Sequence, residues 1–290
     1  MPYRFTVQEK KRRRVIIDTD AACEADDPYA IAHGLMTPRF IVKGILAEQF
    51  NQPGSVQKSY DAIKHLLDLM DIHDVPVLMG TDPLTSETDA PPCEAADFII
   101  REALKDDPHP LYVLCQGALS NVAAAINKCP EIQDRFICIW IGGGFYPRGG
   151  WEFNSVNDYH AANAVFSSRV EVWQVPMSVY TKMQLGYAEL EYKVRPCGKV
   201  GEYLFEQMIE HGMHADWVEG ESWAIGDQPA IGLALNPGCG RYRMQSAPRF
   251  GEGGVYVDCP ENRQIRVYEG IDQRYILEDF FCKLALNYRQ

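Results

Sequence analysis

Four aspartates lie within ten residues near the start of the 290-residue chain, at Asp18, Asp20, Asp26 and Asp27. They follow the apolar run Val15–Ile17, which is typical of a buried strand. Like charges so close together repel one another, and burial adds to that cost. A multivalent cation removes the cost, and carboxylate oxygens favour Ca²⁺ or Mg²⁺ over zinc. The spacing therefore predicts a metal site, and the alternative is a solvated acidic loop that caps the following helix.

Short apolar runs alternate with amphipathic stretches as far as about residue 175. Strands are expected at Arg14–Asp18, Val42–Gln49, Val75–Met79, Leu111–Cys115, Phe136–Ile141 and Val170–Val175. Helices are expected at about Pro28–Leu35, Ser55–Met70, Glu94–Leu104, Ser120–Asn127 and Asp158–Ser167. Unbroken apolar strands that alternate with helices predict an α/β fold, with an open, mostly parallel central sheet and helices on both faces. Ligands of such sheets bind at the carboxyl ends of the strands.

The pattern after about residue 176 is looser. It predicts helices at about 198–211, 222–235 and 276–286, and a strand pair near Gly254–Val257 and Gln264–Tyr268. Neither an internal repeat nor a flexible linker interrupts the sequence. We therefore expect one domain over residues 1–290, in which residues 1–13 form a solvated N-terminal arm carrying most of the basic run KKRRR.

Composition limits the possible partners and the compartment. The formal net charge is −12, from 28 Lys+Arg against 40 Asp+Glu, which argues against nucleic-acid and anionic-membrane partners. Hydrophobic residues make up 46%, enough for a large core, but the sequence contains no apolar run of the roughly 18 residues needed to span a bilayer. The nine cysteines form no C-x-x-C pair, and the first residues contain no apolar signal segment. We therefore expect reduced thiols and a cytoplasmic protein.

Five segments, in order along the chain, resemble the calcium-dependent nucleoside N-ribohydrolases, the inosine-uridine preferring nucleoside hydrolase family. The segment RVIIDTDAACEADDPYAI resembles the signature D-x-D-P-G-x-D-D, although five residues rather than three separate Asp20 from Asp26. The other four segments are similar to the motifs G-P-L-T-N, W-M-G-G, E-F-N-x-x-x-D-P-x-A-A and H-D-P-x-A, and they lie at 117–121, 140–143, 152–162 and 226–230. The resemblance implies a nucleoside hydrolase-like fold with a Rossmann-like core.

The same resemblance implies a metal centre and a reaction. Asp20 would bridge one Ca²⁺ and act as general base for a metal-bound water, while Asp27 and Asp227 would be further carboxylate ligands. Ser120 would contribute its backbone carbonyl, and Asp18 would support the loop from behind. The implied reaction releases ribose and a base from a ribonucleoside. Cleavage of such a bond builds an oxocarbenium-like cation, which a pocket lined with carboxylates stabilises.

Substrate and assembly are also implied. Asp26, Glu152, Asn154 and Asn51 would bind the ribose, as acids and amides recognise hydroxyl groups. The partner would be a small nucleoside or riboside, and the chain would form a homodimer or homotetramer. Many relatives carry a histidine that protonates a purine leaving group, but here the position is Gly226.

Three other interpretations each match a part of the sequence. A haloacid-dehalogenase phosphatase also begins with D-x-D, but it needs Thr or Val where Ala22 stands, and a late acidic residue that is missing. A non-catalytic ribose- or nucleoside-binding protein on the same scaffold would not need Asp20, Asp27 and Asp227 together. A dinucleotide site would need G-x-G-x-x-G, which does not follow the Phe136–Ile141 run.

Overall fold

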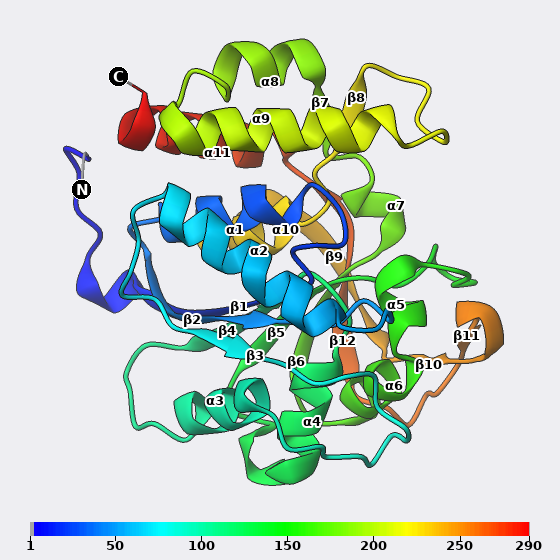
Figure 1. The fold of residues 1–290 in the computed structure, drawn as a ribbon. Coiled ribbons are helices and arrows are strands. Elements are labelled where there is room, and N and C mark those ends of the chain that lie inside the picture. The colour runs from blue at the N-terminus through cyan, green and yellow to red at the C-terminus, as the bar shows by residue number, and fades with distance from the viewer. Residues whose placement is uncertain (1–2, 290) are drawn as a thin grey trace.

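An eight-stranded sheet forms the centre of the structure, a computed structural model that describes residues 3–289 (Figure 1). All neighbouring strands are parallel except the last pair, which is antiparallel. In spatial order the strands are β3 (Val77–Met79), β2 (Phe40–Ala47), β1 (Arg13–Thr19), β4 (Leu111–Cys115), β5 (Ile137–Ile141), β6 (Glu171–Val175), β12 (Gln264–Ile271) and β9 (Gly240–Ser246). The predicted α/β fold with a mostly parallel sheet is confirmed.

Helices cover both faces of the sheet, and each face has its own hydrophobic core (Figure 1). One core contains residues of α1 (Asp27–Leu35), α2 (Ser55–Leu69), α9 (Gly198–Met213), α10 (Gln228–Leu235) and α11 (Gln273–Tyr288). The other contains residues of α3 (Glu94–Ala103), α4 (Ser120–Lys128) and α6 (Tyr159–Ser167). Strand β1 serves both cores, because Val15 and Ile17 pack on one face and Ile16 on the other.

The C-terminal half differs from the prediction in two places. The helix expected over 222–235 begins only at Gln228, because residues 222–224 form strand β8, which pairs with β7 (Gln184–Gly186). The expected pairing of 254–257 with 264–268 is wrong. Strand β11 (Tyr256–Val257) pairs with β10 (Arg249–Phe250), whereas β12 joins the main sheet beside β6. Alternating apolar residues identify a strand but not its partner. Three short helices were also not predicted: α5 (Phe153–Asn157), α7 (Met177–Tyr180) and α8 (Tyr187–Lys193).

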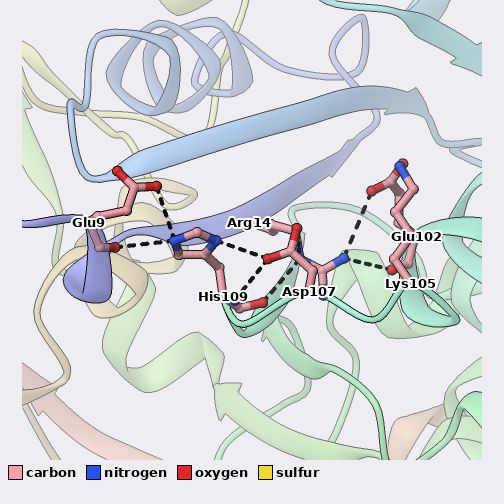
Figure 2. Close-up of polar contacts among 6 residues, drawn as sticks. All are labelled: Glu9, Arg14, Glu102, Lys105, Asp107 and His109. Carbon is pink, nitrogen blue, oxygen red and sulfur yellow. Dashed lines mark hydrogen bonds and ion pairs between the residues drawn. The ribbon is translucent and has the colours of Figure 1, made fainter.

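Part of the basic run near the N-terminus is structural rather than solvated. Strand β1 begins at Arg13, and Arg14 is buried at the amino end of the sheet. Arg14 donates to the carbonyls of Glu102 at 2.7 Å and His109 at 3.0 Å, and its guanidinium lies 3.9 Å from the buried Glu102 carboxylate (Figure 2). His109 in turn contacts the Glu9 carbonyl at 3.2 Å. These contacts lie at the edge of the sheet opposite the strand ends where ligands are expected. Within residues 3–289, no helix combines the length and apolar character that a membrane span requires.

Candidate active site

Two helices begin at the carboxyl edge of the sheet with aspartates. Asp26 is the residue before α1 and Asp27 is the first residue of that helix, while Asp227 immediately precedes α10. Each helix has a proline in its first turn, which favours a helix start there. The two helices pack together, so sequence segments about 200 residues apart meet. The partial positive charge at each helix N-terminus favours anionic groups at this position.

The three aspartates form a compact cluster of oxygen donors. One carboxylate oxygen from each of Asp26, Asp27 and Asp227 lies within 4.8 Å of the corresponding oxygens of the other two, and all three residues are buried. Asp20 lines the same pocket as this cluster. Its Oδ2 is buried without a hydrogen-bond partner. Buried carboxylates with an unpartnered oxygen suit a hard divalent cation, so the donor set fits the expected metal.

Burial and mutual repulsion shift the titration of these groups. Burial raises the pKa of Asp26 to about 6, although the backbone N–H groups of Gly226 and Asp227 partly oppose the shift. The pKa values of Asp20, Asp27 and Asp227 rise well above the usual range, because burial acts together with repulsion from neighbouring carboxylates. The negative charge of these four carboxylates is therefore stable in the folded state only when protons or a cation balance it.

A second layer of buried polar groups lies beneath the cluster. Asp18 is a buried residue near the carboxyl end of β1, and burial raises its pKa to about 7. The Asn121 side chain donates to the Asp18 carboxylate at 2.9 Å, and the Asn121 backbone N–H donates to the Glu48 carboxylate at 3.1 Å. Asn121 thus ties the start of α4 to the ends of β1 and β2. Sequence analysis missed Glu48, although its place directly after β2, beside β1, could have indicated it.

A pocket of about 370 Å³, its open mouth included, contains the cluster. Its lining residues combine acids and amides with a few apolar side chains: Asp20, Cys23, Glu24, Asp26, Asp27, Gln116, Ile141, Glu152, Phe153, Asn154, Tyr180, Gly226 and Asp227. Cys23 and Glu24 belong to the longer loop between Asp20 and Asp26, so this loop contributes to the pocket wall. Among residues 3–289, no histidine lines the pocket. His33 is buried and contacts Gln228 and Asp279, as expected for a packed helix residue.

Glu152 and Asn154 line the pocket but are also occupied by the protein itself. The buried Glu152 carboxylate accepts from the backbone N–H groups of Gly143, Asn154 and Ser155 at 2.7–3.1 Å. It also accepts from the Tyr180 hydroxyl at 2.9 Å. The Asn154 amide donates to the carbonyls that follow β4 and end β5, at 2.9 Å each. Both side chains therefore hold the strand-end loops in place.

Two predicted site residues do not line the pocket. The Ser120 hydroxyl donates to Asp158 at 2.9 Å and accepts from Gln49 at 2.9 Å. Asn51 is exposed and has a positive φ of 54°, a conformation that asparagine tolerates better than most residues. The structure thus brings together Asp20, Asp26, Asp27, Asp227, Glu152 and Asn154, with Asp18 beneath them, and leaves Ser120 and Asn51 outside the pocket lining.

Comparisons with known proteins agree with this geometry. The sequence profile of the family "Inosine-uridine preferring nucleoside hydrolase" matches residues 15–277. The chain belongs to this family. It is 26% identical to the pyrimidine-specific ribonucleoside hydrolase RihA of Salmonella arizonae over 241 residues, which cover 74% of this chain and 75% of the relative.

Two solved structures share the fold of this family member. The plant nucleoside hydrolase PpNRh1 superposes with a TM-score of 0.77 at 20% identity, over 94% of this chain and 98% of that one. The purine-preferring ribonucleoside hydrolase from Gardnerella vaginalis gives 0.77 at 23% identity, over 95% and 99%. Family membership makes this chain an N-glycosyl hydrolase of ribonucleosides and excludes the phosphatase alternative.

Proposed function

We propose that this chain hydrolyses the N-glycosidic bond of ribonucleosides with the help of one Ca²⁺ held at the carboxyl edge of the sheet. The observation that carries the proposal is the meeting of Asp227 with Asp26 and Asp27, whose carboxylate oxygens lie within 4.8 Å of one another. Asp20, Asp27 and Asp227 would hold the ion, as the resemblance implies, and Asp26 is a further carboxylate of the cluster. The backbone carbonyl of Ser120 stays a predicted ligand.

Calcium suits this donor set better than zinc. All side chains of the cluster offer carboxylate oxygens, which hard cations prefer, whereas zinc usually takes nitrogen or sulfur ligands. When bound, the ion would polarise the attacking water and orient it toward the anomeric carbon of the ribose.

Asp20 is the best candidate for the general base. Its unpaired Oδ2 is a free acceptor beside the cluster, and its pKa is raised by burial and by Asp27. A carboxylate with a raised pKa is a stronger proton acceptor, so Asp20 can take the proton from the water as the C–N bond breaks. Asp18 and Asn121 support Asp20 from beneath, where Asn121 donates to Asp18.

The ribose would lie between the acids and the loops that follow β4 and β5. Asp26 keeps its predicted role toward a ribose hydroxyl in addition to its place in the cluster. Asn154 can offer its side-chain oxygen to the sugar, because its amide hydrogens are used by backbone carbonyls. Glu152 already accepts four hydrogen bonds, so we assign it a positioning role for the loop and for Tyr180.

Release of ribose from uridine, cytidine and inosine tests the proposal. Uridine and cytidine come first, because the relative from Salmonella arizonae is named as pyrimidine-specific. We expect calcium-dependent ribose release by the wild type and loss of release in Asp20→Asn. Asp272→Asn is the matched control, since Asp272 caps α11 at an exposed position away from the pocket. Binding of nucleosides without ribose release would contradict hydrolysis and favour the non-catalytic alternative.

The predicted assembly is a separate proposal. We propose that the chain forms a homodimer or homotetramer in the cytoplasm. Light scattering after size-exclusion chromatography tests the oligomeric state. A monomer at the concentration of the activity assay would contradict it.

A further inference from the structure

Tyr180 is held rigidly in the wall of the pocket. It ends the short helix α7, where its backbone N–H donates to the Pro176 carbonyl at 3.2 Å and its own carbonyl accepts from Met183 at 3.0 Å. Its hydroxyl donates to the buried Glu152 carboxylate at 2.9 Å. Moving the ring away would remove one of the donors that satisfy this buried carboxylate, which costs free energy. Tyr180 is therefore fixed at both ends of its side chain.

The Tyr180 ring also fills the space beside Gly226. A Cβ atom at position 226 would lie 2.9 Å from Cδ2 and 3.6 Å from Cε2 of Tyr180, and 3.4 Å from the Asp26 carboxylate. The first of these distances is too short for real carbon atoms. A tyrosine ring in this position thus requires glycine at 226, and the two residues act as a complementary pair.

The pocket lining divides by chemistry into two kinds of surface. The aspartates suit the hydroxyl groups and the developing positive charge of the ribose. The apolar lining consists of Ile141, Phe153 and Tyr180, and aromatic rings suit a planar heterocyclic base. With the sugar at the acids, the base faces this apolar part.

We propose that Tyr180 is the specificity-determining residue of the leaving-group part of the pocket. Its ring provides one wall for the base and limits the room there, so that a single-ring base fits better than a two-ring base. This inference rests on the proposed function, since it assumes that a ribonucleoside occupies the pocket. The rigidity of Tyr180 carries the size limit, because a mobile side chain would simply make room for a purine.

The test compares kcat/KM for uridine and inosine in the wild type, Tyr180→Ala and Tyr180→Phe. We expect the wild type to favour uridine and Tyr180→Ala to shift the ratio toward inosine by about tenfold or more, the range that a change in pocket volume produces. Tyr180→Phe keeps the ring but loses the hydroxyl bond to Glu152, so its preference for uridine should lie between those of the wild type and Tyr180→Ala. Tyr192→Ala is the control, because Tyr192 is 73% exposed on α8. A wild type that favours inosine, or an unchanged ratio in folded Tyr180→Ala, would overturn the inference.

A second pair of variants tests the complementarity of positions 180 and 226 without an activity assay. We expect Gly226→Ala to lower the melting temperature, and Tyr180→Ala/Gly226→Ala to lower it by less than the two single changes together. Strict additivity would contradict the close packing. If the wild type hydrolyses neither nucleoside, the proposed function fails. The ratio of dissociation constants for uridine and inosine, measured by calorimetry on wild type and Tyr180→Ala, then decides the inference separately.

Discussion

Replacing Asp227 with asparagine should stabilise the metal-free protein while abolishing its stabilisation by calcium. Asp227 faces Asp26, Asp27 and Asp20, whose charges all raise its pKa, and its side chain makes no capping hydrogen bond to α10. Coulomb's law with an effective dielectric constant of about 20 gives about 3.5 kcal/mol for two full charges at the 4.8 Å limit of the cluster. The loss of a favourable charge at the helix N-terminus opposes this by only about 0.3–1 kcal/mol.

Because burial and the neighbouring carboxylates raise the pKa of Asp227, the repulsion between two full charges overstates the free energy that the substitution releases. We therefore expect a net gain of at least about 1 kcal/mol, or a rise in melting temperature of about 2–4 °C for a chain of this size. The assay is thermal unfolding of chelator-treated protein, with and without added Ca²⁺. The wild type should gain stability on calcium addition, by about 2.7 kcal/mol at a hundredfold excess over the dissociation constant. Asp227→Asn should gain almost none.

Asp272→Asn provides the matched control for this substitution. Asp272 also precedes a helix, but it is exposed and its carboxylate accepts from the Tyr275 backbone N–H at 2.9 Å. Asparagine caps helices as well as aspartate does, so the melting temperature should barely change and the calcium response should stay intact. A fall in the melting temperature of metal-free Asp227→Asn, or a full calcium response in that variant, would refute the reasoning.

Three further predictions concern pH, the base and the opposite edge of the sheet. The pKa values of Asp18 and Asp26 are raised in the folded state to about 7 and about 6. Between these values and the ordinary value near 4, the folded chain therefore binds more protons than the unfolded chain. The melting temperature of the metal-free protein should fall as the pH rises from about 4 to 7. Saturating Ca²⁺ should flatten this slope, and an equal slope with calcium would contradict the assignment. Asp20→Asn should lower kcat by at least about 100-fold and weaken the calcium-induced rise in melting temperature, because Asp20 would serve both as base and as a ligand of the ion; near-normal turnover would exclude Asp20 as the base. Arg14→Leu should destabilise the fold by about 3 kcal/mol in urea unfolding, because it leaves the Glu102 carboxylate and two backbone carbonyls without this donor. The kcat of this variant should be unchanged. A loss of stability below about 1 kcal/mol would argue against a structural role for Arg14.

The central sheet could be predicted because each of its first six strands carries a local signal. Val15–Ile17 is apolar without interruption, as a strand buried on both faces must be, and the following acids mark its carboxyl end. Strand β12 was expected, but its place beside β6 was not, since a strand's own residues do not specify which edge it joins. The pairing follows from the packing of the whole C-terminal half.

The candidate site was predictable only in part. Asp18, Asp20, Asp26 and Asp27 stand close together in the sequence, and the chemistry of their spacing indicates a cation. Asp227 was found by resemblance alone, because nothing in its local pattern connects it with residues 200 positions earlier.

The positions of Tyr180 and Asn51 relative to the site could not be predicted from their local sequence. Tyr180 lies at the end of a four-residue helix after β6, and a single aromatic residue there is as consistent with core packing as with a site. Asn51, which lies outside the pocket lining, is expected at the ribose by the resemblance, but the turn that follows β2 leaves its side chain exposed. Spacing along the chain fixes which loop a residue occupies, not the direction of its side chain.

A calcium titration of chelator-treated protein, followed by ribose release from uridine, tests the central claim most directly. The account predicts no release without the ion and full recovery once about one equivalent of Ca²⁺ is bound per chain. Full activity of the calcium-free protein would contradict it.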